Sequence, residues 1–105
     1  MTSVDARARL RGWFNANANH WCGGAIVATL KVTLPTEANK ALVEFVADTH
    51  IASITLWENG MLEFIVLDLG TKEFVISEDI ECNSLDEVES NLNTCLSRIE
   101  SLTRP

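Results

Sequence analysis

Basic residues are scarce in this 105-residue sequence. Eight Lys and Arg stand against fifteen Asp and Glu, so the formal net charge is −7 and the sequence pI about 4.6. Proteins that hold DNA or RNA need a positive face for the phosphates, so this composition argues against direct nucleic-acid binding. Long apolar runs are also missing, which argues against a membrane span. The 47% of hydrophobic and 22% of charged residues are instead typical of one soluble globular domain over residues 1–105.

The few basic residues are unevenly placed. Residues 1–40 carry five Lys and Arg and two carboxylates, which gives a net charge of +3. Residues 41–105 carry three Lys and Arg and thirteen carboxylates, which gives a net charge of −10. A negative field of this strength can steer a basic partner toward the protein and accelerate their encounter. The alternative is that the acidic residues only keep a small domain soluble.

Cysteines number three and form no CxxC pair, so one thiol stays unpaired in any disulfide scheme. The N-terminus lacks the basic and then apolar segment of a secretory signal. Both features favour a reducing cytoplasm, with the cysteines as small buried hydrophobic residues. A zinc site of His20, Cys22 and Cys82 is the alternative, but it lacks the paired-ligand spacing of structural zinc sites. We therefore expect no metal and no cofactor.

Enzyme motifs are absent as well, since the chain has no GxxxxGK(S/T), no GxGxxG and no HExxH. His20 and Cys22 are close enough in sequence to suggest a thiol–imidazole pair, but no third group is evident to orient the histidine. Neighbouring carboxylates such as Glu78 and Asp79 have no aromatic sugar-binding cleft beside them. We therefore expect no catalytic residues and no enzyme.

Hydrophobic spacing near 3.6 residues indicates a helix at each end of the chain. The first helix covers residues 3–18, with Thr2 or Ser3 as its cap and Asp5 in its first turn. The last begins at a capping box of Ser84 and Glu87. Its expected buried stripe consists of Leu85, Val88, Leu92, Cys95, Leu96, Ile99 and Leu102.

Between the helices, apolar and polar residues alternate with a period of two, which indicates strands joined by short connections. The expected strands cover residues 25–34, 42–47, 51–57, 61–68 and 73–78. Asn59-Gly60 favours a two-residue type I′ turn, with Trp57 opposite Leu62 and Thr55 opposite Phe64. The expected fold class is α+β, an antiparallel β-meander of about five strands with an N-terminal and a C-terminal helix packed on the sheet.

The hairpin from His50 to Asp68 resembles the central hairpin of the TriTu family of immunity proteins. That family's pattern is I-x-x-I-T-(V/L)-W-x-(S/N)-G, followed by an acidic-aliphatic strand that ends in LD. The matching positions are Ile51, Ile54, Thr55, Trp57 and Gly60. The resemblance covers about residues 42–102, and Met61 and Leu62 depart from the smaller or more polar pair expected after the turn.

The resemblance implies a cytoplasmic antitoxin of contact-dependent growth inhibition, which neutralises the toxin domain delivered by a neighbouring bacterium. The implied partner is the C-terminal domain of that toxin, typically a tRNA-cleaving nuclease that works with elongation factor Tu. A basic nuclease surface built to hold RNA suits an acidic inhibitor, so the implied mechanism is occlusion of the active-site or RNA-binding surface.

Six carboxylates lie within the twelve residues 78–89, and such a cluster repels itself unless a basic partner or salt relieves it. Trp57, beside the hairpin tip, is a candidate anchor because interface hot spots favour Trp. Burial under a helix, across from Leu62, is the alternative for this ring. The expected toxin-binding residues are Trp57, Glu58, Glu63, Glu78, Asp79 and Glu81.

Two other classes of protein fit the same residues. One is a small acidic adaptor or oligomeric scaffold, in which the N-terminal helix docks a second copy to give a homodimer. The other is a secretion-chaperone-like module, which would bind an extended peptide of an effector. An immunity protein, by contrast, should bind only a folded toxin domain.

Overall fold

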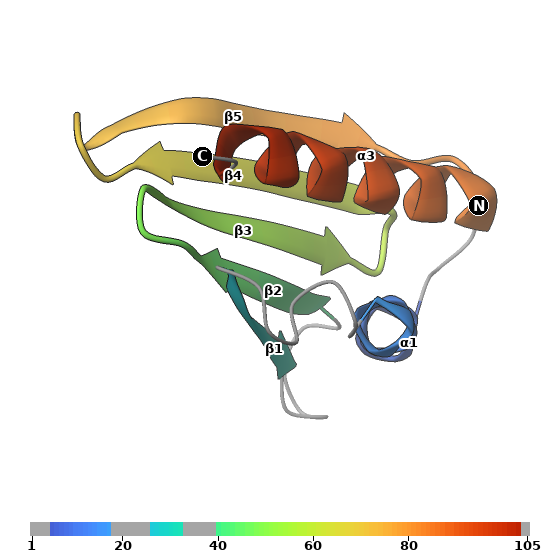
Figure 1. Ribbon diagram of the computed structural model, residues 1–105. Coiled ribbons are helices and arrows are strands. Elements are labelled where there is room, and N and C mark those ends of the chain that lie inside the picture. The colour runs from blue at the N-terminus through green and yellow to red at the C-terminus, as the bar shows by residue number, and fades with distance from the viewer. Residues whose placement is uncertain (1–4, 18–25, 33–39, 104–105) are drawn as a thin grey trace.

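The computed structural model describes residues 5–17, 26–32 and 40–103, which form one five-stranded antiparallel sheet and two helices (Figure 1). The sheet order is β1-β2-β3-β4-β5, so the expected meander and α+β class are confirmed. The elements are α1 (Ala6–Ala16), β1 (Val27–Val32), β2 (Lys40–Val46), β3 (His50–Trp57), β4 (Met61–Asp68), β5 (Glu73–Glu81) and α3 (Leu85–Thr103).

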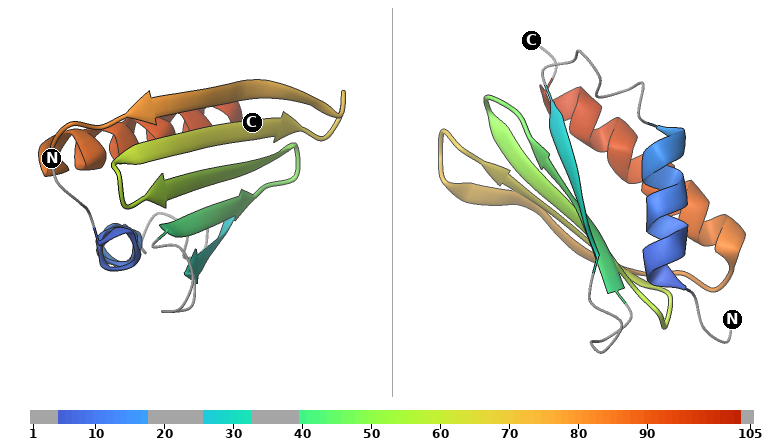
Figure 2. Two further views of the ribbon diagram at one scale, coloured as in Figure 1. Left: turned by 180° about the vertical axis from the view of Figure 1, so that it is seen from behind. Right: turned by 90° about the horizontal axis from the view of Figure 1, so that it is seen from below.

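Both helices pack on the same face of the sheet, as the view from below shows (Figure 2). Side chains alternate between the two faces of each strand, and those facing the helices are the buried ones. Phe45 of β2, Ile54 of β3 and Phe64 of β4 are at most 1% exposed. Leu10 of α1 and Leu92 of α3 are fully buried against them. The core therefore lies between the sheet and a single layer of helices.

The N-terminal helix starts later than expected. Asp5 itself is the N-cap of α1, and its carboxylate accepts a hydrogen bond of 3.2 Å from the Ala8 N–H. The expectation that Asp5 lies within the first turn is therefore wrong. The proposed caps Thr2 and Ser3 fall outside the described residues, as do residues 33 and 34 of the first expected strand.

The β3–β4 turn differs from the expected type I′ turn. That turn needs positive φ at both central residues, yet only Gly60 of the pair has one, at 88°. The Gly60 N–H donates to the Trp57 carbonyl at 3.0 Å, and the Met61 N–H donates to Asn59 Oδ1 at 2.9 Å. The loop thus spans three residues, a tight turn followed by a left-handed glycine.

The longer loop shifts the hairpin register by one residue. Leu56 pairs with Leu62 and Thr55 with Glu63, so the expected pairing of Trp57 with Leu62 and of Thr55 with Phe64 is wrong. A shift of one residue exchanges the two faces of a strand. Trp57 therefore lies half-buried on the face away from the helices, and the alternative of burial under a helix does not apply.

The C-terminal part follows the expected pattern with three differences. Strand β5 continues to Glu81 rather than ending at residue 78. The Ser84 hydroxyl caps α3 by accepting from the Glu87 N–H at 3.1 Å, while the Glu87 carboxylate accepts from the Asn83 N–H rather than from that of Ser84. The buried stripe contains Val88, Leu92, Cys95, Leu96 and Ile99. Leu85 and Leu102 are 44% and 36% exposed and stand outside it.

Candidate functional site

The face of the sheet away from the helices, called here the open face, is covered by no helix of the described chain (Figure 2). The strand registers place its side chains in rows that cross the sheet. One row, near the β3–β4 turn, consists of Lys31, Leu42, Thr55, Glu63 and Asp79. Its positive charge lies on the β1 side and its negative charges on the β4–β5 side.

A pocket opens at the turn end of this face. Trp57, Asn59, Met61, Glu63 and Asp79 line a cavity of about 270 Å³, called here the hairpin pocket. The structure thus brings together three of the expected toxin-binding residues. Glu81 pairs with Met61 across the strands and so lies on the same face, and Glu58 is exposed in the adjoining turn.

Glu63 and Asp79 stand directly opposite each other on β4 and β5. Like charges in this position repel each other. Within residues 5–17, 26–32 and 40–103, the ion pairs join Lys31 to Glu44, His50 to Asp68 and Arg98 to Glu78, and none reaches Glu63 or Asp79. The negative charge of the hairpin pocket is therefore available to a cation from outside the described chain.

Glu78 is separated from the other expected residues. Neighbouring residues of a strand point to opposite faces, so Glu78 faces the helices while Asp79 faces away. Arg98 of α3 donates hydrogen bonds of 3.0 and 2.7 Å to the two Glu78 oxygens and lies 5.3 Å from the Phe64 ring centroid. These bonds lower the pKa of Glu78 and raise that of Arg98. Glu78 thus holds β5 to α3.

An apolar row crosses the far end of the open face, which the sequence reasoning missed. Its members are Val27, Val46, Ile51, Leu67 and Phe74. Val27 is 65% exposed and Phe74 66% exposed, although both are large hydrophobic residues. Contiguous exposed apolar surface rimmed by charge is typical of protein interaction sites. In the sequence, each strand contributes one apolar residue to this row. These residues can be recognised as neighbours only when the strand registers are known.

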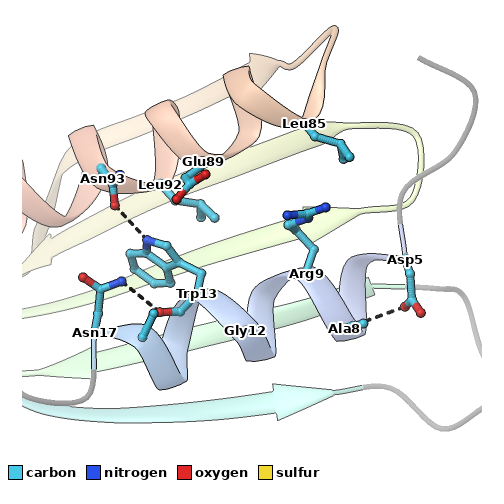
Figure 3. A pocket seen from close by; sticks show the side chains of 11 residues that line it. Asp5, Ala8, Arg9, Gly12, Trp13, Asn17, Leu85, Glu89, Leu92 and Asn93 are labelled. Atoms are coloured by element: carbon cyan, nitrogen blue, oxygen red, sulfur yellow. Dashed lines mark hydrogen bonds between the residues drawn. The ribbon is translucent and has the colours of Figure 1, made fainter.

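A second cavity, of about 610 Å³, lies between α1 and α3 (Figure 3). Its α1 wall includes the small residues Ala8 and Gly12. Trp13 also lines the cavity and links the two helices, because its Nε1 donates a hydrogen bond of 2.9 Å to Asn93 Oδ1. Arg9 lies on its α1 wall and Glu89 on its α3 wall. The lining of this cavity therefore carries charges of both signs.

The described cysteines are buried, and the described histidine, His50, lies 2.8 Å from Thr49 Oγ1 and 3.8 Å from Asp68 Oδ2. Cys82 and Cys95 are buried free thiols, and burial raises the pKa of Cys95 to about 12. Their expected role as small buried hydrophobic residues is confirmed, whereas His20 and Cys22 lie outside the described residues. Among residues 5–17, 26–32 and 40–103, no three metal-binding side chains gather into a site. Neither described helix is long and apolar enough to cross a membrane.

Comparison with protein families matches residues 8–98 to the model described as "Immunity protein TriTu". The match extends well beyond the hairpin, from α1 through the whole sheet and most of α3. It therefore includes the N-terminal region, in which the sequence alone offered no specific resemblance. Comparison with curated proteins finds no match.

Proposed function

Because the chain belongs to the TriTu family of immunity proteins, we propose that it neutralises its cognate toxin by binding the toxin domain through the open face. The observation that carries this assignment of the surface is the unpaired acidic cluster beside Trp57, on the side that the helices leave uncovered. Blocking a toxin by occlusion needs no catalytic step, so the chain acts as a binding protein rather than an enzyme.

The toxin that fits this surface best is a nuclease that cleaves tRNA. Such an enzyme holds RNA phosphate with a basic surface, which the −10 net charge of residues 41–105 complements. The chain covers that surface in the cytoplasm of a cell that receives the toxin by contact-dependent growth inhibition. Elongation factor Tu joins the complex through the toxin rather than through this chain.

The proposed interface has two parts on one face. Glu58, Glu63, Asp79 and Glu81 pair with basic residues of the toxin around Trp57 as an anchor. The apolar row at the far end of the open face supplies the desolvated surface that interface cores need. Glu78 contributes indirectly, because its ion pair with Arg98 keeps β5 against α3.

The test is co-expression of the chain with the toxin domain encoded beside its gene, with growth as the readout. We expect growth to be restored and a one-to-one complex to elute from a sizing column. The variant E63Q/D79N should protect less than D86N/E89Q, which removes the same charge from exposed positions of α3. Toxicity that the wild-type chain fails to relieve would refute the proposed function, and equal protection by the two variants would place the interface elsewhere.

A further inference from the structure

We propose that the hairpin pocket takes up one arginine side chain of the partner, held between Glu63 and Asp79 beside Trp57. This proposal rests on the proposed function, because the partner is the cognate toxin domain. It goes further by naming the group recognised and the place where it sits. The open face then has a defined anchor point at its acidic end, and the apolar row lies at the opposite end.

The paired carboxylates of the pocket favour a cation. Glu63 and Asp79 face each other across neighbouring strands and share the wall of one cavity. Directly opposed like charges weaken a sheet, so their placement costs stability in the free protein. A cation between them removes this repulsion and makes charge-assisted hydrogen bonds to both. The geometry therefore favours a ligand that carries positive charge and several donors.

Thr55 favours a hydrogen-bond donor beside the pocket, independently of the carboxylates. Thr55 lies directly opposite Glu63 on β3 and is only 7% exposed, the single buried polar residue among the described ones. Within residues 5–17, 26–32 and 40–103 its hydroxyl makes no hydrogen bond. A buried hydroxyl without a partner is costly. Thr55 itself does not line the hairpin pocket, but its cross-strand neighbour Glu63 does, and a guanidinium bound at Glu63 would offer a donor to this hydroxyl.

The indole of Trp57 favours arginine over lysine as the bound group. A guanidinium is planar, stacks on aromatic rings and offers five donors in a fixed fork, whereas an ammonium is a compact and strongly hydrated point charge. Lys40 already lies 6.0 Å from the centroid of the Trp57 ring, and it comes from β2, on the side away from β4. The pocket side of the indole, toward Met61 and Glu63, is the side left for an incoming guanidinium.

The experiment is a set of double-mutant cycles with the toxin domain encoded beside this gene. Each surface arginine of the toxin is replaced in turn by lysine. Calorimetry then measures the dissociation constant of the complex that each toxin variant forms with each version of this chain. The chains used are the wild type, E63Q/D79N and the control D86N/E89Q. We expect that replacing one particular toxin arginine weakens binding to the wild-type chain and to the control about tenfold or more. The same replacement should hardly affect binding to E63Q/D79N, which has already lost the carboxylates.

Two further readouts separate recognition from folding. E63Q/D79N loses the repulsion between the carboxylates, so the free variant should melt no lower than the wild type while it binds the toxin about 10- to 100-fold more weakly. Thr55→Val removes the hydroxyl with little change of shape and should also weaken binding without lowering the melting temperature. If these residues had a purely structural role, their replacement would lower the melting temperature and the affinity for the toxin together.

The outcomes distinguish the proposal from the function on which it rests. A complex that forms normally but shows no arginine coupled to E63Q/D79N, or one in which lysine replaces that arginine without loss, refutes the arginine site and leaves the immunity function intact. A wild-type chain that neither binds nor neutralises the toxin refutes both.

Discussion

At the scale of single residues, the neighbours Glu78 and Asp79 have different roles because one faces α3 and the other does not. Hydrogen bonds from Arg98 lower the pKa of Glu78, so this carboxylate stabilises the fold above its ordinary pKa of 4.5. That contribution is lost as the pH falls through the lowered value, when Glu78 takes up a proton. We expect E78Q to lower the melting temperature at pH 7 and to match the wild type in stronger acid. Melting curves of the wild type, E78Q and the control E81Q from pH 7 downward test this. A difference in melting temperature between E78Q and the wild type that stays constant with pH would contradict it.

A hydrogen bond between Trp13 and Asn93 joins the two helices. Trp13 is 7% exposed and donates from Nε1 to Asn93 Oδ1 at 2.9 Å. Asn93→Ala leaves this donor without its acceptor and should reduce the free energy of unfolding by about 1–3 kcal/mol. Urea denaturation measures the loss. In Trp13→Phe the donor is absent, so Asn93→Ala should cost much less in that background, and an equal cost would show that the bond contributes nothing.

At the scale of elements, two glycines should respond to alanine with opposite signs. Gly60 ends the β3–β4 loop at φ 88°, where a Cβ is strained, so Gly60→Ala should destabilise the protein by about 1–2 kcal/mol. Gly12 lies within α1, and a Cβ built there meets nothing within 4 Å. Gly12→Ala should therefore stabilise the protein by about 0.5–1 kcal/mol. Denaturant titration of both variants is the measurement, and a change of the same sign in both would contradict the argument.

The sequence predicts the elements well because periods of two and of 3.6 residues need no knowledge of tertiary contacts. It does not predict the hairpin register, since Asn59-Gly60 suits both a two-residue turn and a three-residue loop with a left-handed glycine. That one residue decides whether Trp57 shares the helix-facing side with Leu62 or lies on the open face. The expected contact residues were chosen by residue type and remain a prediction. The sequence does not show that Glu78 faces the helices and pairs with Arg98, because Arg98 lies twenty residues away on another element.

At the scale of the whole molecule, charge placement rather than net charge should govern the rate of toxin binding. The screening length falls from about 30 Å at 0.01 M salt to about 10 Å at 0.1 M, so the association rate should drop over this range. E63Q/D79N and D86N/E89Q change the net charge equally, but only the first pair lies on the open face. We expect the first variant to associate several-fold more slowly at low salt and with a weaker salt dependence, and the second to stay near the wild type.

Stopped-flow association rates at several salt concentrations measure this difference. If the field of the whole chain alone steers the encounter, the two variants must slow association by the same factor, because each leaves the same total charge. If the open face meets the toxin, the carboxylates of the hairpin pocket are nearest to the basic surface when the encounter is decided, and their loss acts at the shortest distance. The ratio of the two rates should then approach one as salt screens both sets of charges, whereas a ratio of one at every salt concentration would rule out the open face as the site of encounter.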